Sequence, residues 1–312
     1  YDRGVVRCQG TSGAQDSVLI PVGRGPSSLA VHPDTNRLAC VNRIDGTISI
    51  IDTVSSVVET TISCKPGIHT VIPWDKNAFL VSDSFSNVLQ VVDSTQTAPT
   101  RIFAEVSGVP GVLAASERFV AVGRRVPASV VFLARDTGQQ TGVIDLPETP
   151  KRIGVLPQNR FVILLSDRLL VVDATVPRVL HQKELKVNGL CTSENGILVG
   201  TDEGLIFLGD SLEELRRSSF SDAVGAVAQL GFQVAFFVPT RKEICLTAFV
   251  QTAEAVSAQP TPVSSVPEQS PELGVGVSQS PAEGAESPEP STPSEPPSKT
   301  EEREPLESST TD

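Results

Sequence analysis

The chain has 312 residues, a formal net charge of −12 and a hydrophobic share of 39%, which is below the roughly 45–50% of a typical globular protein. The chain is not strongly basic, and we expect no nucleic-acid partner. The composition also indicates that part of the chain lacks a hydrophobic core, which the distribution of residues locates below.

Two short β-rich runs open the chain, GVVRC at residues 4–8 and SVLIPV at residues 17–22. Both contain several Val or Ile residues, which favour strands. We predict a strand for each run, the third and the fourth strand of a four-stranded unit whose complete copies follow.

The segment 23–53, GRGPSSLAVHPDTNRLACVNRIDGTISIIDT, contains a Gly-Pro turn, two short apolar runs, an Asn-rich turn and a strand that ends in Asp. This strand ending recurs along the chain, and the Asp residues that mark it are Asp52, Asp93, Asp136, Asp173 and Asp210. They are separated by 41, 43, 37 and 37 residues. A degenerate copy without the Asp spans residues 243–249.

Each marked strand is preceded by two apolar runs around a polar turn and followed by a further β-rich run, for example at residues 55–63 and 141–147. Four short strands at a period near 40 residues are the pattern of β-propeller blades. The best helical candidate, residues 210–220, falls between the third and fourth strands of its unit, where we predict a turn. We therefore predict an all-β propeller over residues 1–250.

Residues 21–62, from PVGRGPSSLAV to VVETTI, resemble the YVTN-type β-propeller repeat. In that repeat a Gly-Pro turn, an apolar strand, Pro-Asp, a strand ending in Val-x-Asn and a strand ending in Ile-Asp-Thr follow one another. The resemblance implies a location outside the cytoplasm, in the periplasm, at the surface or secreted, because such repeats are common in bacterial envelope proteins. The cysteines, which we expect to be free and buried, favour a cytoplasmic location as the alternative.

We predict six four-stranded blades. The strands at residues 4–8 and 17–22 are expected to lie beside the last C-terminal strands and so to close the ring without an exposed edge. Seven blades are the alternative if residues are missing upstream of Tyr1, and the absence of Met supports processing or truncation.

The loops from strand four to the next strand one and from strand two to strand three share one face of a propeller, and binding sites favour such loops. Basic side chains predominate in these loops, so we predict a scaffold that binds a protein partner there, with an anionic partner favoured by the charge. Ordinary solvated loop charges are the alternative. The candidate partner-binding residues are Arg24, Arg43, Lys65, His69, Trp74, Arg124, Arg125, Lys151, Arg152 and Arg168.

Trp74, in the turn between the first and second strands, would be a contact anchor if it were exposed, but packing of its ring along the blade edge is the favoured interpretation. Replacement of both Arg124 and Arg125 by Glu is expected to weaken partner binding and to leave folding intact.

We expect no catalytic site, no cofactor and no metal site. The predicted starts of the inner strands carry no carboxylate, and His32, His69 and His181 lie too far apart in the chain for metal-ligand spacing. His69 is the one expected at the mouth of the channel. A lactonase-like propeller hydrolase is one alternative function, and a propeller fragment of a larger intracellular scaffold is another.

The last segment, residues 251–312, contains eleven Pro and no Phe, Trp or Tyr. Its eleven Glu and Asp312 outweigh Lys299 and Arg303, a net −10 out of the −12 of the whole chain. Because such a segment cannot bury enough apolar surface to offset its ordering entropy, we predict a disordered acidic tail. We predict no transmembrane segment, because the longest apolar-leaning stretch, 224–238, is shorter than a span of about 20 residues.

Overall fold

The computed structural model describes residues 4–9, 17–98, 101–230, 233–240 and 243–248. Within these ranges every regular element is a β-strand. The strands form five four-stranded antiparallel sheets, one three-stranded sheet and one two-stranded sheet. The predicted all-β propeller with four-stranded blades is therefore confirmed, and the predicted tail at 251–312 lies outside the described residues.

Blades 1 to 3 each pair their four strands in chain order. Blade 1 comprises β3 (Pro26–Val31), β4 (Arg37–Asn42), β5 (Thr47–Asp52) and β6 (Val57–Ser63). Blade 2 comprises β7 (Ile68–Pro73), β8 (Ala78–Asp83), β9 (Val88–Asp93) and β10 (Arg101–Glu105). Blade 3 comprises β11 (Pro110–Ala115), β12 (Phe119–Arg124), β13 (Ser129–Ala134) and β14 (Gln140–Asp145).

Blades 4 and 5 have the same order, and a partial sheet comes before blade 1 and after blade 5. Blade 4 comprises β15 (Arg152–Leu156), β16 (Arg160–Leu164), β17 (Arg168–Asp173) and β18 (Arg178–Glu184). Blade 5 comprises β19 (Gly189–Ser193), β20 (Gly196–Thr201), β21 (Gly204–Leu208) and β22 (Glu214–Ser219). The partial sheets are β1 (Gly4–Gln9) with β2 (Ser17–Val22), and β23 (Val227–Leu230) with β24 (Gln233–Val238) and β25 (Glu243–Ala248).

The middle strands of each blade are buried on both faces because another sheet packs on each side. In blade 3, Val120 and Val122 of β12 pack toward blade 2, whereas Phe119 and Ala121 of the same strand pack toward blade 4. Alternate residues thus enter two different cores. This packing explains why the second and third strands read as continuous apolar runs, while the outer strand β22 is mostly exposed.

The recurring Asp builds the turn from the third to the fourth strand. The Asp52 Oδ1 atom accepts hydrogen bonds from the backbone N–H groups of Val54 (3.0 Å) and Ser55 (2.6 Å). Asp93 and Asp173 accept the N–H of the residue two positions later, at 2.8 and 2.7 Å. Because an Asx turn begins with Asp or Asn, these three Asp residues mark the ends of their third strands, whereas Asp136 and Asp210 lie two residues beyond β13 and β21.

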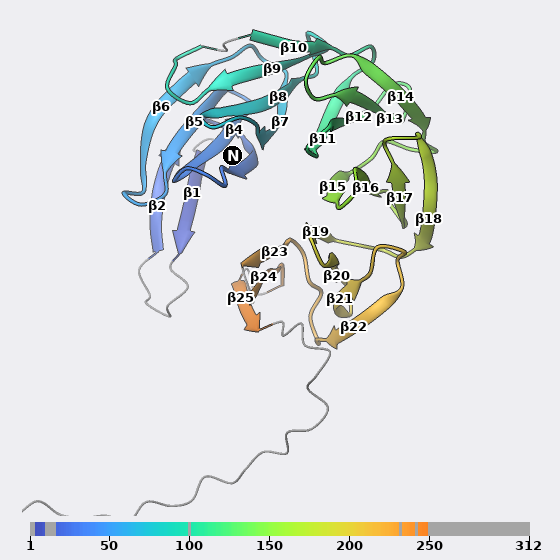
Figure 1. The fold of residues 1–312 in the computed structure, drawn as a ribbon. Helices are drawn as coiled ribbons and strands as arrows, with labels where there is room; N and C mark the ends of the chain where they lie inside the picture. The colour runs from blue at the N-terminus through green and yellow to red at the C-terminus, as the bar shows by residue number, and fades with distance from the viewer. Residues whose placement is uncertain (1–3, 10–16, 99–100, 231–232, 241–242, 249–312) are drawn as a thin grey trace, which may run out of the picture. The chain divides into compact units, whose positions relative to one another are not determined.

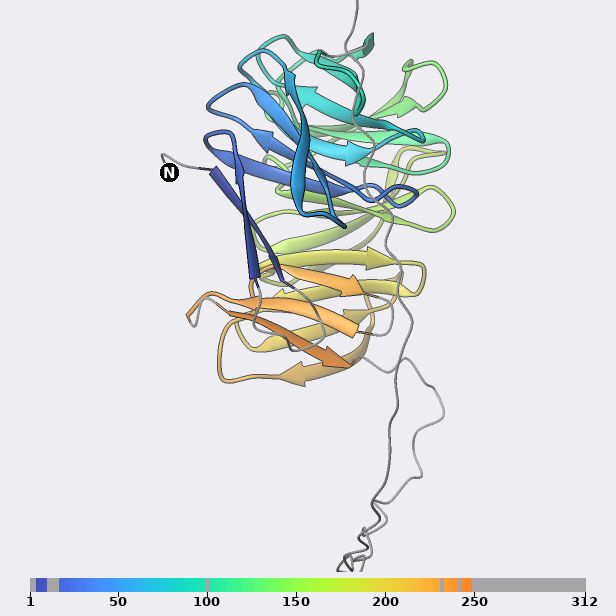
Figure 2. The same cartoon turned by 90° about the vertical axis from the view of Figure 1, so that its left-hand side faces the viewer.

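The first strands of successive sheets contact one another, from β3 through β7, β11, β15 and β19 to β23. In Figure 1 these strands lie innermost within their blades and the fourth strands lie outermost. Figure 2 shows the same sheets from the side, with the dark-blue β1–β2 hairpin beside blade 1 and the orange sheet β23–β25 beside the yellow blade 5. The first strands therefore line the centre, and the loops that enter them lie at one end of the blades.

The predicted closure of the ring differs from the structure. Strand β1 pairs with β2, and this hairpin packs Val6 and Ile20 on Leu38, Cys40 and Ile51 of blade 1. The sheet β23–β25 instead packs on blade 5. Among the described strands none joins these two sheets, so the count of six is corrected to five complete blades with a partial sheet at each end of the series.

Candidate protein-interaction face

One end of the blades, which we call the loop face, carries two sets of loops. One set joins the fourth strand of a sheet to the first strand of the next, and the other joins the second strand to the third. The sets are hydrogen-bonded to each other: the N–H groups of Arg43, Ser84 and Arg125 donate to the carbonyls of Gly25, Gly67 and Val109, each at 2.9 Å. All the predicted partner-binding residues except Trp74 lie at this end.

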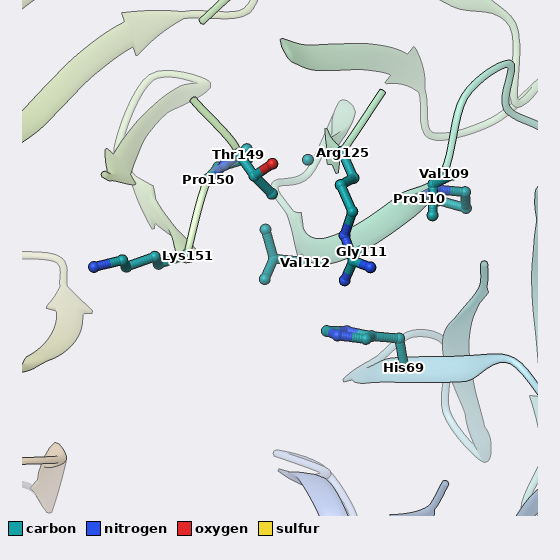
Figure 3. A pocket seen from close by; sticks show the side chains of 10 residues that line it. His69, Val109, Pro110, Gly111, Val112, Arg125, Thr149, Pro150 and Lys151 are labelled. Atoms are coloured by element: carbon teal, nitrogen blue, oxygen red, sulfur yellow. The ribbon is translucent and has the colours of Figure 1, made fainter. Parts of the chain in front are cut away.

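A hollow of about 230 Å³ opens on the loop face where blades 2, 3 and 4 meet (Figure 3). His69 of β7, Arg125 of the β12–β13 loop and Lys151, which directly precedes β15, all line it. In Figure 3 the Arg125 side chain extends toward His69, whereas Lys151 points away from both. The structure therefore brings three of the predicted residues, from three consecutive blades, to one hollow.

A β-bulge near the start of the first strand positions His69. The β7–β8 register shifts between Ile68 and Val71, and the first strands of blades 1 and 3 have a shift at the equivalent place. Hydroxyls hold the bulged backbone: the Ser82 Oγ accepts the Thr70 N–H (3.1 Å) and donates to the Gly111 carbonyl of blade 3 (2.8 Å). Since bulges redirect side chains, this one orients His69 toward the hollow.

The electrostatic environment of His69 is cationic. Burial lowers the pKa of its imidazole below the ordinary value, and the charges of Arg43 and Arg125 lower that pKa further. The imidazole Nδ1 atom lies 2.9 Å from the Thr70 hydroxyl. At neutral pH the ring is therefore neutral, and the positive charge of this region comes from the arginines.

The predicted cations divide into paired and unpaired groups. Arg24 forms an ion pair with Asp45 (2.6 Å), and Arg168 forms one with Asp167 (3.0 Å). A second group makes no ion pair with any residue that the structure describes, and its members are Arg43, Lys65, Arg125, Lys151 and Arg152. All five are exposed. These five side chains are the ones available to an anionic partner.

Lys151 has the most mixed surroundings of the five. It lies near Glu148, whose pKa is lowered first by hydrogen bonds from Ser166 and then by the charge of Lys151. Asp167 is also close enough for Lys151 to lower the pKa of its carboxyl group, although Arg168 contributes more. The positive potential is therefore less opposed by carboxylates at Arg125 than at Lys151.

Arg124 is a structural residue, which corrects its prediction as a partner-binding one. Its side chain is buried, Nε donates to the Ser129 hydroxyl (2.8 Å), and Nη1 donates to the Ser107 carbonyl (2.9 Å). These bonds join β12, β13 and the loop that precedes β11. A buried guanidinium with these partners does not tolerate Glu, so the double replacement of Arg124 and Arg125 would not leave folding intact.

Trp74 is also buried, at 7% exposure, so it is removed from the partner-binding candidates, and the favoured interpretation, packing of its ring, is the one observed. Its ring packs on Phe103 with centroids 4.9 Å apart, and the Arg135 guanidinium lies over it at 4.4 Å. Arg135 also donates to the Trp74 carbonyl (2.9 Å). Arg135 belongs to the next blade, 61 residues later. The sequence around Trp74 therefore does not indicate that a guanidinium lies over its ring.

The sequence prediction missed three apolar side chains on the loop face. Ile44, Phe85 and Val126 are 56%, 74% and 63% exposed, and each occupies the same place in the loop from the second to the third strand of blades 1, 2 and 3. They follow one another at intervals of 41 residues. That interval, close to the period of the blades, is the signal that would have found them; we call them the tip residues.

Within the described ranges, no three His, Cys, Asp or Glu side chains lie close enough together to hold a metal ion. Cys40, Cys64, Cys191 and Cys245 are free thiols. Burial raises the pKa of Cys40 to about 11, and burial together with the charge of Asp83 raises that of Cys64 to about 12. No helix among the described residues is long and apolar enough to cross a membrane.

Comparison with known proteins supports the fold. No protein-family model matches the chain, and no curated protein sequence matches it. Among solved structures, the computationally designed Ika8 protein has a TM-score of 0.56 at 14% identity and covers 74% of this chain and 73% of its own. Kuenenia stuttgartiensis hydrazine synthase has a TM-score of 0.56 at 13% identity, with 77% and 80% covered.

BamB from Moraxella catarrhalis is similar to the same extent, with a TM-score of 0.54 at 14% identity, and 74% of this chain and 76% of BamB are covered. Identities this low show a shared propeller fold and nothing about function. The function must therefore be inferred from the loop face itself.

Proposed function

We propose that this propeller is a non-enzymatic scaffold that binds an acidic segment of a partner protein on its loop face. The observation that carries the proposal is the exposed Arg125, which lies in a hollow, points toward a neutral His69 and has no ion-pair partner among the described residues. A carboxylate placed there would gain a charge-assisted hydrogen bond, which is stronger than a neutral one.

The surrounding cations support the same proposal. Arg43 lies close enough to His69 to lower the pKa of the imidazole, and Lys65 and Arg152 are exposed on the same face without ion-pair partners among described residues. Like charges gathered on one face steer an anionic partner toward it and favour it over a basic one. The propeller supplies the rigid support, because both sets of loops are hydrogen-bonded to each other.

The proposal also includes a family and a location, and both rest on the resemblance of residues 21–62 to the YVTN-type repeat. Membership in the YVTN repeat family, and with it a location outside the cytoplasm, are supported by the order of turn, strand and Ile-Asp-Thr motifs in that segment. The interaction itself does not depend on them, because it is argued from the side chains of the loop face.

A photo-crosslinking experiment in the protein's own cells tests the proposal. A photoreactive amino acid replaces the exposed Ser86 on the loop face and, as a control, the exposed Val54 in a turn on the opposite face. We expect position 86 to label one protein through a segment rich in Asp and Glu, as identified by mass spectrometry. Labelling of the same proteins from both positions, or of a neutral or basic segment, would contradict the proposal.

Charge reversal provides the matched test. Combined with the probe at position 86, Arg125→Glu should reduce the crosslinking yield about tenfold or more, because a favourable contact becomes a repulsive one. Arg178→Glu is the control, since Arg178 is exposed on β18 away from the loop face. Arg124→Glu is unsuitable because Arg124 is buried.

A further inference from the structure

We infer that the acidic partner segment also carries apolar side chains, and that these pack on Ile44, Phe85 and Val126. The inference rests on the proposed function, because it specifies the chemistry of the partner at the same face. Single exposed apolar residues are common on protein surfaces. The recurrence of a large apolar residue at one loop position in three consecutive blades is uncommon, because contact with solvent alone does not select apolar residues at a fixed position.

The loops that enter blades 1, 2 and 3 support the tip residues. Each packs over a glycine in the loop that enters the same blade, and those glycines, Gly25, Gly67 and Gly108, have φ values of +68°, +118° and +90°. An added Cβ would lie 2.6 Å from Ile44 Cγ1, 2.8 Å from Phe85 Cβ and 2.4 Å from the Val126 carbonyl oxygen, respectively. Each tip residue therefore lies in close contact with the loop that enters its own blade.

Hydrogen bonds add to this support. The buried Asp83 carboxylate accepts the backbone N–H groups of Phe85 (2.9 Å) and Ser86 (3.1 Å), and the Ser84 N–H and hydroxyl both donate to the Gly67 carbonyl. Phe85 thus projects into solvent from a loop that is already ordered. Binding on a pre-ordered surface loses less conformational entropy, which is what an interaction site requires.

The tip residues are accompanied by positive charge. Arg43 directly precedes Ile44, and Arg125 directly precedes Val126. Neither arginine forms an ion pair with a described residue. Ser84 stands at the equivalent position before Phe85, so two of the three tips pair an apolar with a cationic side chain. Such a surface complements a segment that carries both apolar and acidic residues. Charge complementarity therefore specifies an acidic and apolar protein segment as the occupant.

Blades 4 and 5 set the limit of this surface. Their loops from the second to the third strand are shorter, spanning residues 165–167 and 202–203, and lack an exposed large apolar residue. They carry Asp167, Asp202 and Glu203, with side chains that are 67%, 52% and 78% exposed. All three form ion pairs, with Arg168, Lys186 and Arg217 respectively. These two loops therefore add no net positive charge that would hold a flat anionic membrane on the whole face, whereas a protein segment can follow blades 1 to 3 alone.

Three synthetic peptides test the inference with the full-length protein. The first alternates Leu and Glu, the second replaces each Leu by Ser, and the third replaces each Glu by Lys. We expect the first to bind in a fluorescence-anisotropy titration and the other two to bind at least about tenfold more weakly. The second peptide loses the apolar contacts, and the third loses the charge opposite to that of the arginines.

Variants of the protein localise the binding. Phe85→Ser should weaken the Leu–Glu peptide about tenfold, because a large apolar contact is lost. Val54→Ser, at an apolar residue of 75% exposure on the opposite face, should leave the affinity unchanged. An unchanged melting temperature shows that each variant is folded, and both residues are exposed enough for this to be expected.

The outcomes separate this inference from the proposed function. If the Ser–Glu peptide binds as tightly as the Leu–Glu peptide and only Arg125→Glu weakens both, the tip residues are not part of the site and the proposed function stands. If no peptide binds although position 86 crosslinks an acidic segment in cells, the inference is likewise wrong. Phe85-dependent binding to anionic lipid vesicles, or a Phe85-dependent dimer in sedimentation, would replace the protein segment by a membrane or a second copy.

Discussion

At the scale of residues, Arg124 and Arg125 show how neighbouring side chains of the same type acquire different roles. Arg124 is the last residue of β12, and its guanidinium is buried against Ser107 and Ser129. Arg125 begins the following loop and is exposed. The sequence predicts that both lie at the loop face, which is correct, but burial depends on the loop before β11, which is distant in the chain.

His69 yields a prediction on pH. Its pKa is lowered in the folded protein by burial and then by Arg43 and Arg125. In the unfolded chain the imidazole regains a pKa near 6.5, so on acidification the unfolded state takes up the proton first and stability falls as the pH drops below that value. We expect His69→Gln to reduce the fall in melting temperature between about pH 7.5 and about pH 5.5.

Thermal unfolding followed by circular dichroism at the two pH values measures this effect. Arg125→Gln is the matched variant, since it retains His69 but removes one of the charges that lower its pKa, and it should reduce the pH dependence in part. Carboxylates such as Asp52, whose pKa is lowered by hydrogen bonds from Ser55, titrate below this window. If His69→Gln has the same pH dependence as the wild type, the account of its electrostatic environment is wrong.

At the scale of elements, the loops that enter blades 1, 2 and 3 each depend on a glycine with positive φ, Gly25, Gly67 and Gly108. Gly67 has a φ of +118°, and a Cβ there would lie 2.6 Å from an Asp83 carboxylate oxygen and 2.8 Å from Phe85. We expect Gly67→Ala to lower the free energy of unfolding by about 1–3 kcal/mol, because it combines backbone strain with a steric conflict.

Gly111→Ala is the control for this prediction. A Cβ at Gly111 would lie 3.6 Å from its nearest neighbour, the Gly123 carbonyl oxygen, and its φ is not in the left-handed region. The change in the free energy of unfolding should stay within about 0.5 kcal/mol. Urea denaturation measures both variants, and equal stability of the two would show that the Gly67 loop relaxes around an added methyl group.

Features that depend on residues nearby in the chain could be predicted from the sequence, and features that depend on contacts with another sheet could not. Asp52 and Asp173 cap the turns that follow their own strands, so these residues locate the ends of β5 and β17 correctly. The packing of the β1–β2 hairpin on blade 1, and the cover of Trp74 by Arg135, depend on neighbouring sheets. The tip residues could have been predicted, because their spacing of 41 residues is visible in the sequence.

At the scale of the whole described propeller, stability is divided among cores that each lie between two consecutive sheets. The core between blades 3 and 4 contains Phe132 and Phe161, both fully buried, with ring centroids 5.8 Å apart. Alternate residues of β13 enter the core on the other side, where Val131 and Leu133 pack toward blade 2. Interactions of this kind couple nearest neighbours, as in other repeat proteins.

This division predicts a local effect of a core cavity. Phe132→Ala should lower the free energy of unfolding by about 3–5 kcal/mol, the usual cost for a buried Phe, whereas Phe85→Ala, at an exposed Phe, should change it by less than about 0.5 kcal/mol. Hydrogen exchange then locates the loss. Protection of β13 and β16, whose side chains share the core of Phe132, should fall more than protection of β4 in blade 1, because that strand contacts neither. An equal loss of protection in all three strands would mean that the blades unfold as one unit and that the nearest-neighbour description is wrong.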